Sequence, residues 1–120
     1  MDLASIQRLA AQQDAARDAA RSYAARVRSE FGTRVNWIKL FGSLARGDWM
    51  GPDESDVDVA VVLHGRTDED SERSVRLATD EMLASGFVIS PRVFSTDEFL
   101  RLQERELRLP RDIMTEGETL

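Results

Sequence analysis

Two aspartates, Asp56 and Asp58, have the type and spacing that most directly suggest chemistry in this chain. They open the run DVDVAVVL, which is typical of a β-strand, and residues two apart on a strand project from the same face, roughly 7 Å apart. Two carboxylates this close repel each other, and burial without a partner raises their pKa values or costs stability. Hard oxygen ligands suit Mg²⁺ or Mn²⁺, so the pair predicts a metal site. The alternative is a solvated pair of acids at the start of a strand.

A second candidate feature is the segment GSLARG, which begins with Gly42 and Ser43 and follows an apolar, aromatic run. Glycine lets a backbone approach a ligand closely. Ser43 supplies a hydroxyl at a point where free backbone N–H groups would face an anion. Arg46 adds positive charge suited to a polyphosphate. The segment predicts a phosphate-binding turn; the alternatives are a plain helix cap for Ser43 and an ion pair from Arg46 to Asp48 or Asp53.

The two features together predict more than either alone. A phosphate-binding turn at the end of one strand and a metal-binding pair at the start of the next suit transfer of a nucleotidyl group from a nucleoside triphosphate. Two nearby residues have simpler explanations. Lys39, the only lysine, fits a strand residue whose stem lies along apolar surface. His64, the only histidine, fits an exposed turn.

The composition limits the class of protein. A chain of 120 residues, 42% hydrophobic and 32% charged, predicts one folded domain over residues 1–120. Its net charge of −6 argues against direct nucleic-acid binding, which needs a positive surface. The absence of cysteine excludes disulfides, thiol catalysis and cysteine-based zinc sites. No segment resembles a signal peptide or approaches the ~18 apolar residues of a membrane span, so a cytoplasmic location without membrane contact is expected.

The elements that must position these residues follow from hydrophobic periodicity and helix-capping signals. Helices are predicted over 4–31, 67–85 and 95–108, and strands over 35–41, 56–63 and 87–94. The last strand contains Pro91, which places it at an edge or a bulge. The first helix is predicted to bury one stripe at helical spacing, made of Ala16, Ala20, Tyr23, Val27 and Phe31. The tail after residue 108 shows no clear element.

This order predicts an α/β (α+β) fold, a small mixed sheet of three to four strands with helices packed on one face and the second face open. Along the second strand, alternation divides the side chains between the two faces. One face carries Val57, Val59, Val61 and Leu63. The other carries Asp56, Asp58, Ala60 and Val62. We therefore expect the two carboxylates on the open face.

Residues 41–61 resemble the minimal nucleotidyltransferases of the DNA polymerase β-like superfamily. Their signature is GS followed by RG, and then SD, any residue, D and a hydrophobic residue; here it reads GSLARG and, after a slightly long spacer at 48–54, SDVDV. The element order extends the resemblance over the whole chain. It implies the polymerase β-like nucleotidyltransferase fold, with Gly42, Ser43 and Arg46 holding the triphosphate and Asp56 and Asp58 as catalytic ligands of Mg²⁺ or Mn²⁺.

Small stand-alone members of this superfamily are often antitoxins of toxin–antitoxin pairs. Their partner is a separate helical HEPN-type protein, often an RNase, and some members silence it by transferring AMP to a tyrosine. The resemblance thus implies an enzyme that uses ATP and a divalent metal to adenylylate a protein partner.

One departure from the superfamily keeps an alternative open. Polymerase β-like enzymes carry a third carboxylate on a later strand, whereas the strand predicted over 87–94 contains no acid, and Ser90 and Arg92 share the face concerned. Asp97 and Glu98 follow, but they fit a helix N-terminus and a capping box. The alternative function is an antitoxin of little or no catalytic activity that binds nucleotide and neutralises its partner by binding, its acidic surface masking a basic RNA-binding surface.

A third function, modification of an antibiotic or a tRNA, fits the sequence less well. Relatives that act on antibiotics usually carry a further helical domain to hold the acceptor. An enzyme that acts on tRNA is expected to show a basic surface, and this chain is acidic.

Overall fold

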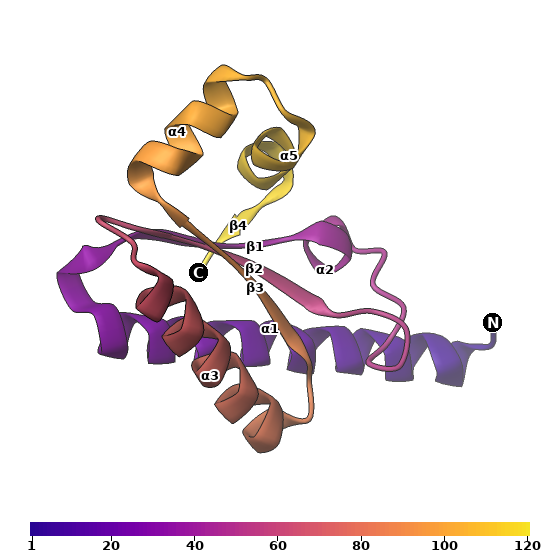
Figure 1. The fold of residues 1–120 in the computed structure, drawn as a ribbon. Helices are drawn as coiled ribbons and strands as arrows, with labels where there is room; N and C mark the ends of the chain where they lie inside the picture. Colours follow the sequence, from indigo (N-terminus) through magenta and orange to yellow (C-terminus); the bar gives the residue numbers. More distant parts are fainter.

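The computed structural model describes all 120 residues, in which a four-stranded mixed sheet lies between two layers of helices (Figure 1). The helices are α1 (Leu3–Phe31), α2 (Gly42–Arg46), α3 (Asp68–Ser85), α4 (Thr96–Glu104) and α5 (Arg108–Glu116). The strands are β1 (Val35–Phe41), β2 (Val57–Leu63), β3 (Ile89–Ser95) and β4 (Glu118–Thr119). A 3₁₀ turn, η1 (Gly32–Arg34), joins α1 to β1. The predicted fold class is confirmed.

The sheet has the strand order β3-β2-β1-β4. β1 runs antiparallel to β2 and to β4, and β2 runs parallel to β3. Phe41 at the end of β1 lies opposite Asp58, and Asp58 lies beside Ser90 of β3. The end of β1 and the starts of β2 and β3 therefore meet at one end of the sheet. The edge position expected for the strand with Pro91 is confirmed.

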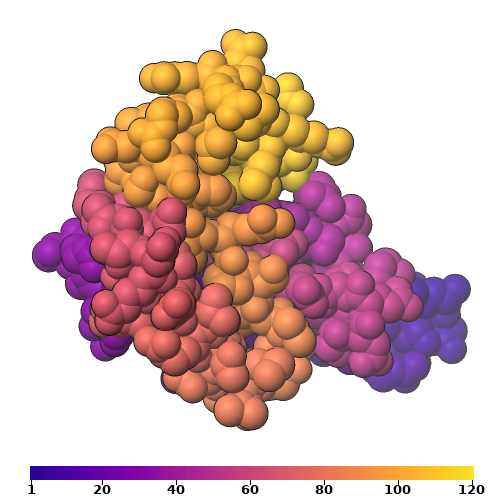
Figure 2. Space-filling view, in the orientation of Figure 1, coloured from indigo at the N-terminus to yellow at the C-terminus, as the bar shows by residue number.

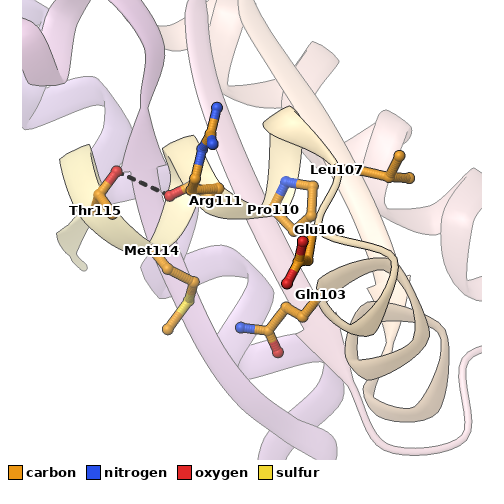
Figure 3. A pocket seen from close by; sticks show the side chains of 7 residues that line it. All are labelled: Gln103, Glu106, Leu107, Pro110, Arg111, Met114 and Thr115. Atoms are coloured by element: carbon orange, nitrogen blue, oxygen red, sulfur yellow. Dashed lines mark hydrogen bonds between the residues drawn. The ribbon is translucent and has the colours of Figure 1, made fainter.

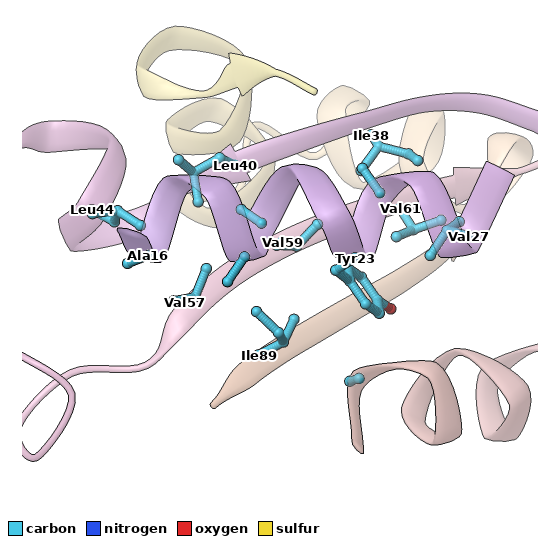
Figure 4. Close-up of a cluster of buried hydrophobic side chains, with 14 of the residues drawn as sticks. Ala16, Tyr23, Val27, Ile38, Leu40, Leu44, Val57, Val59, Val61 and Ile89 are labelled. Carbon is cyan, nitrogen blue, oxygen red and sulfur yellow. The ribbon is translucent and has the colours of Figure 1, made fainter. Parts of the chain in front are cut away.

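One face of the sheet packs against α1 and α3 (Figures 1 and 4). The stripe predicted on the first helix is buried throughout, and it contacts Ile38 and Leu40 of β1 and the odd-numbered residues of β2. The Tyr23 hydroxyl lies inside this core and donates a hydrogen bond to the Ser74 carbonyl of α3, 3.1 Å away. The buried hydroxyl therefore has a hydrogen-bond partner, and this bond links α1 to α3 across the face of the sheet.

The second face of the sheet is not open as expected, because α4 and α5 cover much of it (Figures 1 and 2). Phe99 of α4 and Ile113 of α5 are buried against Ala60 and Val62 of β2. On this face of β2, Ala60 and Val62 thus belong to a second core, whereas Asp58 lies outside it, at the start of the strand.

The single helix predicted over 95–108 is wrong for a local reason. Helix α4 stops after Glu104, and Glu106 has a positive φ of 53°, which turns the chain back. Helix α5 follows, with Pro110 in its first turn, where the missing N–H has no helical partner to lose. The chain then returns to the sheet as β4.

The start of α1 extends past the sheet, and its Leu3 and Ile6 are exposed (Figures 1 and 2). No helix combines the length and the apolar character that crossing a membrane requires.

Candidate functional site

Asp58 is the second residue of β2 and is half-buried, whereas Asp56 precedes the strand and is exposed. Burial raises the pKa of Asp58 above its ordinary value, and the neighbouring charge of Asp56 raises it further. Arg92 and Arg46 lie close enough to oppose this shift. The two predicted metal ligands are therefore together, in a site where negative charge is disfavoured until a cation arrives.

Gly42 brings the predicted phosphate-binding turn directly against this carboxylate. Its φ is +75°, a left-handed conformation that side chains rarely adopt. A Cβ at this position would overlap the Asp58 Oδ2 atom. Both the conformation and the space require glycine, so the backbone of the turn packs on the acid itself.

Helix α2, which carries Gly42 and Ser43, is held in place from outside. Leu44 is buried in the core, and Gly47 ends the helix in a left-handed conformation. Arg17 of α1 donates a hydrogen bond to the Leu44 carbonyl, 2.8 Å away, and pairs with Glu118 of β4 at 3.1 Å. Ser43 is partly exposed, in the first turn of α2, where backbone N–H groups have no helical acceptor. Sequence reasoning missed Arg17, because its partners are distant along the chain.

Arg46 is exposed and forms two ion pairs. It lies 3.3 Å from Glu116 of α5 and 3.4 Å from Asp48, and these two hydrogen-bonded acids raise its pKa. The pairing to Asp48 was one of the alternatives drawn from the sequence; no ion pair to Asp53 forms. Glu116, in the unassigned tail, is a neighbour of the site that sequence reasoning missed.

The face of β3 on which the resemblance implies a third acid carries none, only Ser90 and Arg92. Ser90 lies beside Asp58 and Arg92 beside Ala60, so both face the same side as the aspartate, as the alternation predicted. Nowhere in the chain do three or more His, Asp or Glu side chains converge in a way that could hold a metal ion.

Asp97, Glu98 and His64 lie at the opposite end of the sheet from the aspartate pair, whereas Lys39 lies opposite Ala60, two residues along β2 from Asp58. Ser95, which precedes Asp97 and Glu98, pairs with Leu63 of β2. Leu63 lies five residues along the strand from Asp58, which is about 16 Å. Glu98 caps α4 through Ser95, as predicted. His64, at this same far end, lies 3.1 Å from the Thr96 hydroxyl. Lys39 bonds Thr119 at 3.4 Å and lies over the Trp37 ring.

Two adjacent carboxylates fit a divalent cation of the Mg²⁺ type. Such an ion commonly takes one or two protein carboxylates and completes its shell with water and substrate phosphates. A cation here would offset both the burial of Asp58 and its repulsion by Asp56. The chemistry of the donor set therefore agrees with the ion that the sequence predicts.

The largest cavity lies elsewhere, on the outside of α4 and α5 (Figure 3). Its volume is about 460 Å³. It is lined by Gln103, Glu106, Leu107, Pro110, Arg111, Met114 and Thr115. The Thr115 hydroxyl donates to the Arg111 carbonyl within α5, 2.8 Å away. None of the candidate site residues lines it.

Comparison with known proteins gives concordant results. The family model described as a nucleotidyltransferase domain matches residues 21–118. A protein of Methanocaldococcus jannaschii, provisionally named a protein adenylyltransferase, is 33% identical over 94 residues, which cover 78% of this chain and 86% of the relative.

Solved structures with the same fold share much less sequence. A provisionally named nucleotidyltransferase from Sulfolobus solfataricus has a TM-score of 0.51 at 17% identity and covers 99% of this chain and 87% of its own. A toxin–antitoxin structure with AMP-PNP has a TM-score of 0.53 at 18% identity, and the match covers 82% of this chain and 69% of the other. A variant of the toxin–antitoxin pair MntA-HpeT has a TM-score of 0.52 at 16% identity, covering 79% and 67%.

Proposed function

The chain belongs to the nucleotidyltransferase domain family and is a nucleotidyltransferase, and we propose that it transfers AMP from ATP to a protein partner as the antitoxin of a toxin–antitoxin pair. The observation that carries the proposal is the packing of Gly42 on the Asp58 carboxylate, beside Asp56. This contact puts a turn suited to phosphate and a pair of acids suited to a metal within one small site.

The reaction requires an acceptor hydroxyl oxygen to attack the α-phosphorus of ATP. The bond from that phosphorus to the β-phosphate oxygen breaks, pyrophosphate leaves, and the hydroxyl proton passes to a base. Gly42 and Ser43 would bind the triphosphate through backbone N–H groups and the serine hydroxyl. Asp56 and Asp58 would hold Mg²⁺ or Mn²⁺, which supplies charge stabilisation when bound. Arg46 would add a charge-assisted contact to a phosphate after leaving its acidic partners.

The nature of the acceptor is supported by the relatives. The relative from M. jannaschii carries the name of a protein adenylyltransferase, and one structural neighbour is a toxin–antitoxin structure with an ATP analogue. In another, two aspartates spaced two apart are changed to glutamate, the spacing of Asp56 and Asp58. We take the partner to be a HEPN-type toxin and the location of the reaction to be the cytoplasm, where ATP is available.

A second candidate function is neutralisation by binding alone. The observation that favours it is Arg92, which lies on the face of β3 where the resemblance implies a third acid. In that case an acidic surface would mask the toxin, and the site would bind nucleotide without transfer.

The test is labelling with α-³²P-ATP and Mg²⁺ or Mn²⁺ in lysate of the source cell. Label is expected on a discrete protein band with the unmodified chain and to be lost with Asp56→Asn. Asp97→Asn, an exposed acid at the far end of the sheet, is the matched control and should label normally. If folded protein transfers nothing, and Asp56→Asn still binds and neutralises the partner, binding alone is the function.

A further inference from the structure

We propose that Arg92 is a ligand for the β- and γ-phosphates of the bound nucleotide, an inference that rests on the function proposed above. The guanidinium would thus lie on the same face of the sheet as Asp58. The consequence is a site that binds its substrate through an arginine on β3 as well as through the turn at Gly42.

The position of Arg92 follows from the strand register. β3 runs parallel to β2, Arg92 lies beside Ala60, and Ala60 is two residues along from Asp58 on the same face. The face is covered by α4 and α5 from Ala60 onward, at Val62 and Phe94. Arg92 itself remains exposed. It therefore stands at the rim of the second core, between the covered part of the sheet and the aspartates.

Arg92 has no carboxylate partner within ion-pair distance. Arg17, Arg26, Arg34, Arg46, Arg66 and Arg73 each pair with an acid. Arg92 forms none of these pairs, although it lies on the same face of the sheet as Asp58, beside Ala60. Its donors are therefore free for a ligand that approaches the site.

The chemistry of that ligand follows from the guanidinium. Its planar fork of N–H donors matches two oxygens of a phosphate, and charge-assisted contacts of this kind are the stronger hydrogen bonds. An acidic peptide would be repelled by Asp56 and Asp58 in the same site, whereas a nucleotide can bring a cation with its phosphates. A nucleoside triphosphate is the anion that both the acids and the arginine accept.

Isothermal titration of the whole protein with a non-hydrolysable ATP analogue and with AMP, each with Mg²⁺ and with EDTA, tests the inference. Arg92→Ala should weaken binding of the ATP analogue about 10- to 100-fold and leave AMP within twofold. Arg92→Lys should restore part of the loss. Arg76→Ala is the matched control, because Arg76 is an exposed arginine of α3 with no ion pair, on the opposite side of the sheet.

Two results would overturn the inference: unchanged binding of the ATP analogue in Arg92→Ala, or equal losses for the analogue and AMP. If the unchanged nucleotide affinity comes with tighter Mg²⁺ binding, Arg92 is only a counter-charge to the aspartates. Transfer is measured separately. If the unmodified protein binds the analogue but transfers no label, the transfer proposal fails and the role of Arg92 is still decided by the titration. If it binds no nucleotide, both fail.

Discussion

Gly42 has two independent reasons to be glycine, and a matched pair of variants separates them. Gly42→Ala is expected to lower the free energy of unfolding by about 2–4 kcal/mol and to abolish transfer, because a Cβ overlaps Asp58 and the backbone is left-handed. Gly86 has a similar φ of +83° with open space around it, so Gly86→Ala should lower stability by only about 1–2 kcal/mol and spare activity. Urea unfolding and the labelling assay measure both. Equal effects of the two variants would contradict the contact with Asp58.

The two ion pairs of Arg46 compete with its proposed role at the phosphate. Glu116→Gln removes one acidic partner while keeping the shape of the side chain. If Arg46 binds phosphate, this change should raise the affinity for the ATP analogue by up to about fivefold, because less is lost when the pair opens. Arg46→Ala should lower the affinity. An unchanged affinity in both variants would leave Arg46 a purely structural residue that ties α2 to α5.

Asp70 gives the stability of the chain a defined pH dependence. Hydrogen bonds from the Arg34 guanidinium, 3.1 Å away at one oxygen, hold the pKa of this buried carboxyl well below its usual range. A lowered pKa stabilises the fold above the ordinary value near 4, and this stabilisation is lost as the pH falls. Asp70→Asn should therefore cost about 2 kcal/mol at pH 7 and progressively less toward pH 3.

Thermal unfolding across this pH range measures the effect, with Asp80→Asn as the control at an exposed position of the same helix. A loss in Asp70→Asn that does not change with pH would mean that packing, not charge, is what the substitution removes.

At the scale of elements, one residue, Trp49, anchors the long spacer between Ser43 and Asp56 to the first core. Trp49 is fully buried in the first core, with its ring 6.0 Å from that of Phe87, and its carbonyl accepts a hydrogen bond from Gln13. The indole N–H is buried without a partner. The ring therefore stabilises the fold through apolar contacts. Its N–H group makes no hydrogen bond, so a ring without this group would lose no hydrogen bond.

Trp49→Ala is expected to lower the free energy of unfolding by about 3–5 kcal/mol, because it opens a cavity in the core. Trp49→Phe keeps an aromatic ring and removes the unsatisfied donor, so it should cost about 1–2 kcal/mol. Urea unfolding followed by circular dichroism compares them without relying on the fluorescence of the residue that changes. If phenylalanine is as damaging as alanine, the indole N–H has a partner.

The sequence predicted what local patterns determine. The turn at Gly42, the spacing of Asp56 and Asp58 and the capping box at Glu98 involve neighbours along the chain, and the stripe on α1 follows helical periodicity. It could not predict the turn at Glu106, where a left-handed residue is neither glycine nor asparagine. Because that turn was not predicted, the sequence could not predict that α5 covers the second face of the sheet. Arg17 and Glu116 were missed because only the fold brings them to α2.

At the scale of the whole molecule, the site lies where the two helical layers meet. Helix α2 is bonded to α1 through Arg17 and Leu44 at 2.8 Å, and to α5 through Arg46 and Glu116 at 3.3 Å. Asp58 projects from β2, the strand that both cores share, and Asp56 directly precedes this strand. If the two layers unfold as one unit, a substitution that destabilises either core should make the site unfold in the same transition as the rest of the chain.

We expect that cooperative behaviour. Leu40→Ala in the first core and Ile113→Ala in the second should each lower the free energy of unfolding by about 2–5 kcal/mol. In a Trp49→Phe background, Trp37 is the only tryptophan and packs on Phe99, 4.9 Å away, so its fluorescence reports the second core. In urea, fluorescence and circular dichroism should change together in both variants. Loss of Trp37 fluorescence ahead of circular dichroism in Ile113→Ala alone would mean that α4 and α5 form a separate unit, able to open the aspartate site while the first core stays folded.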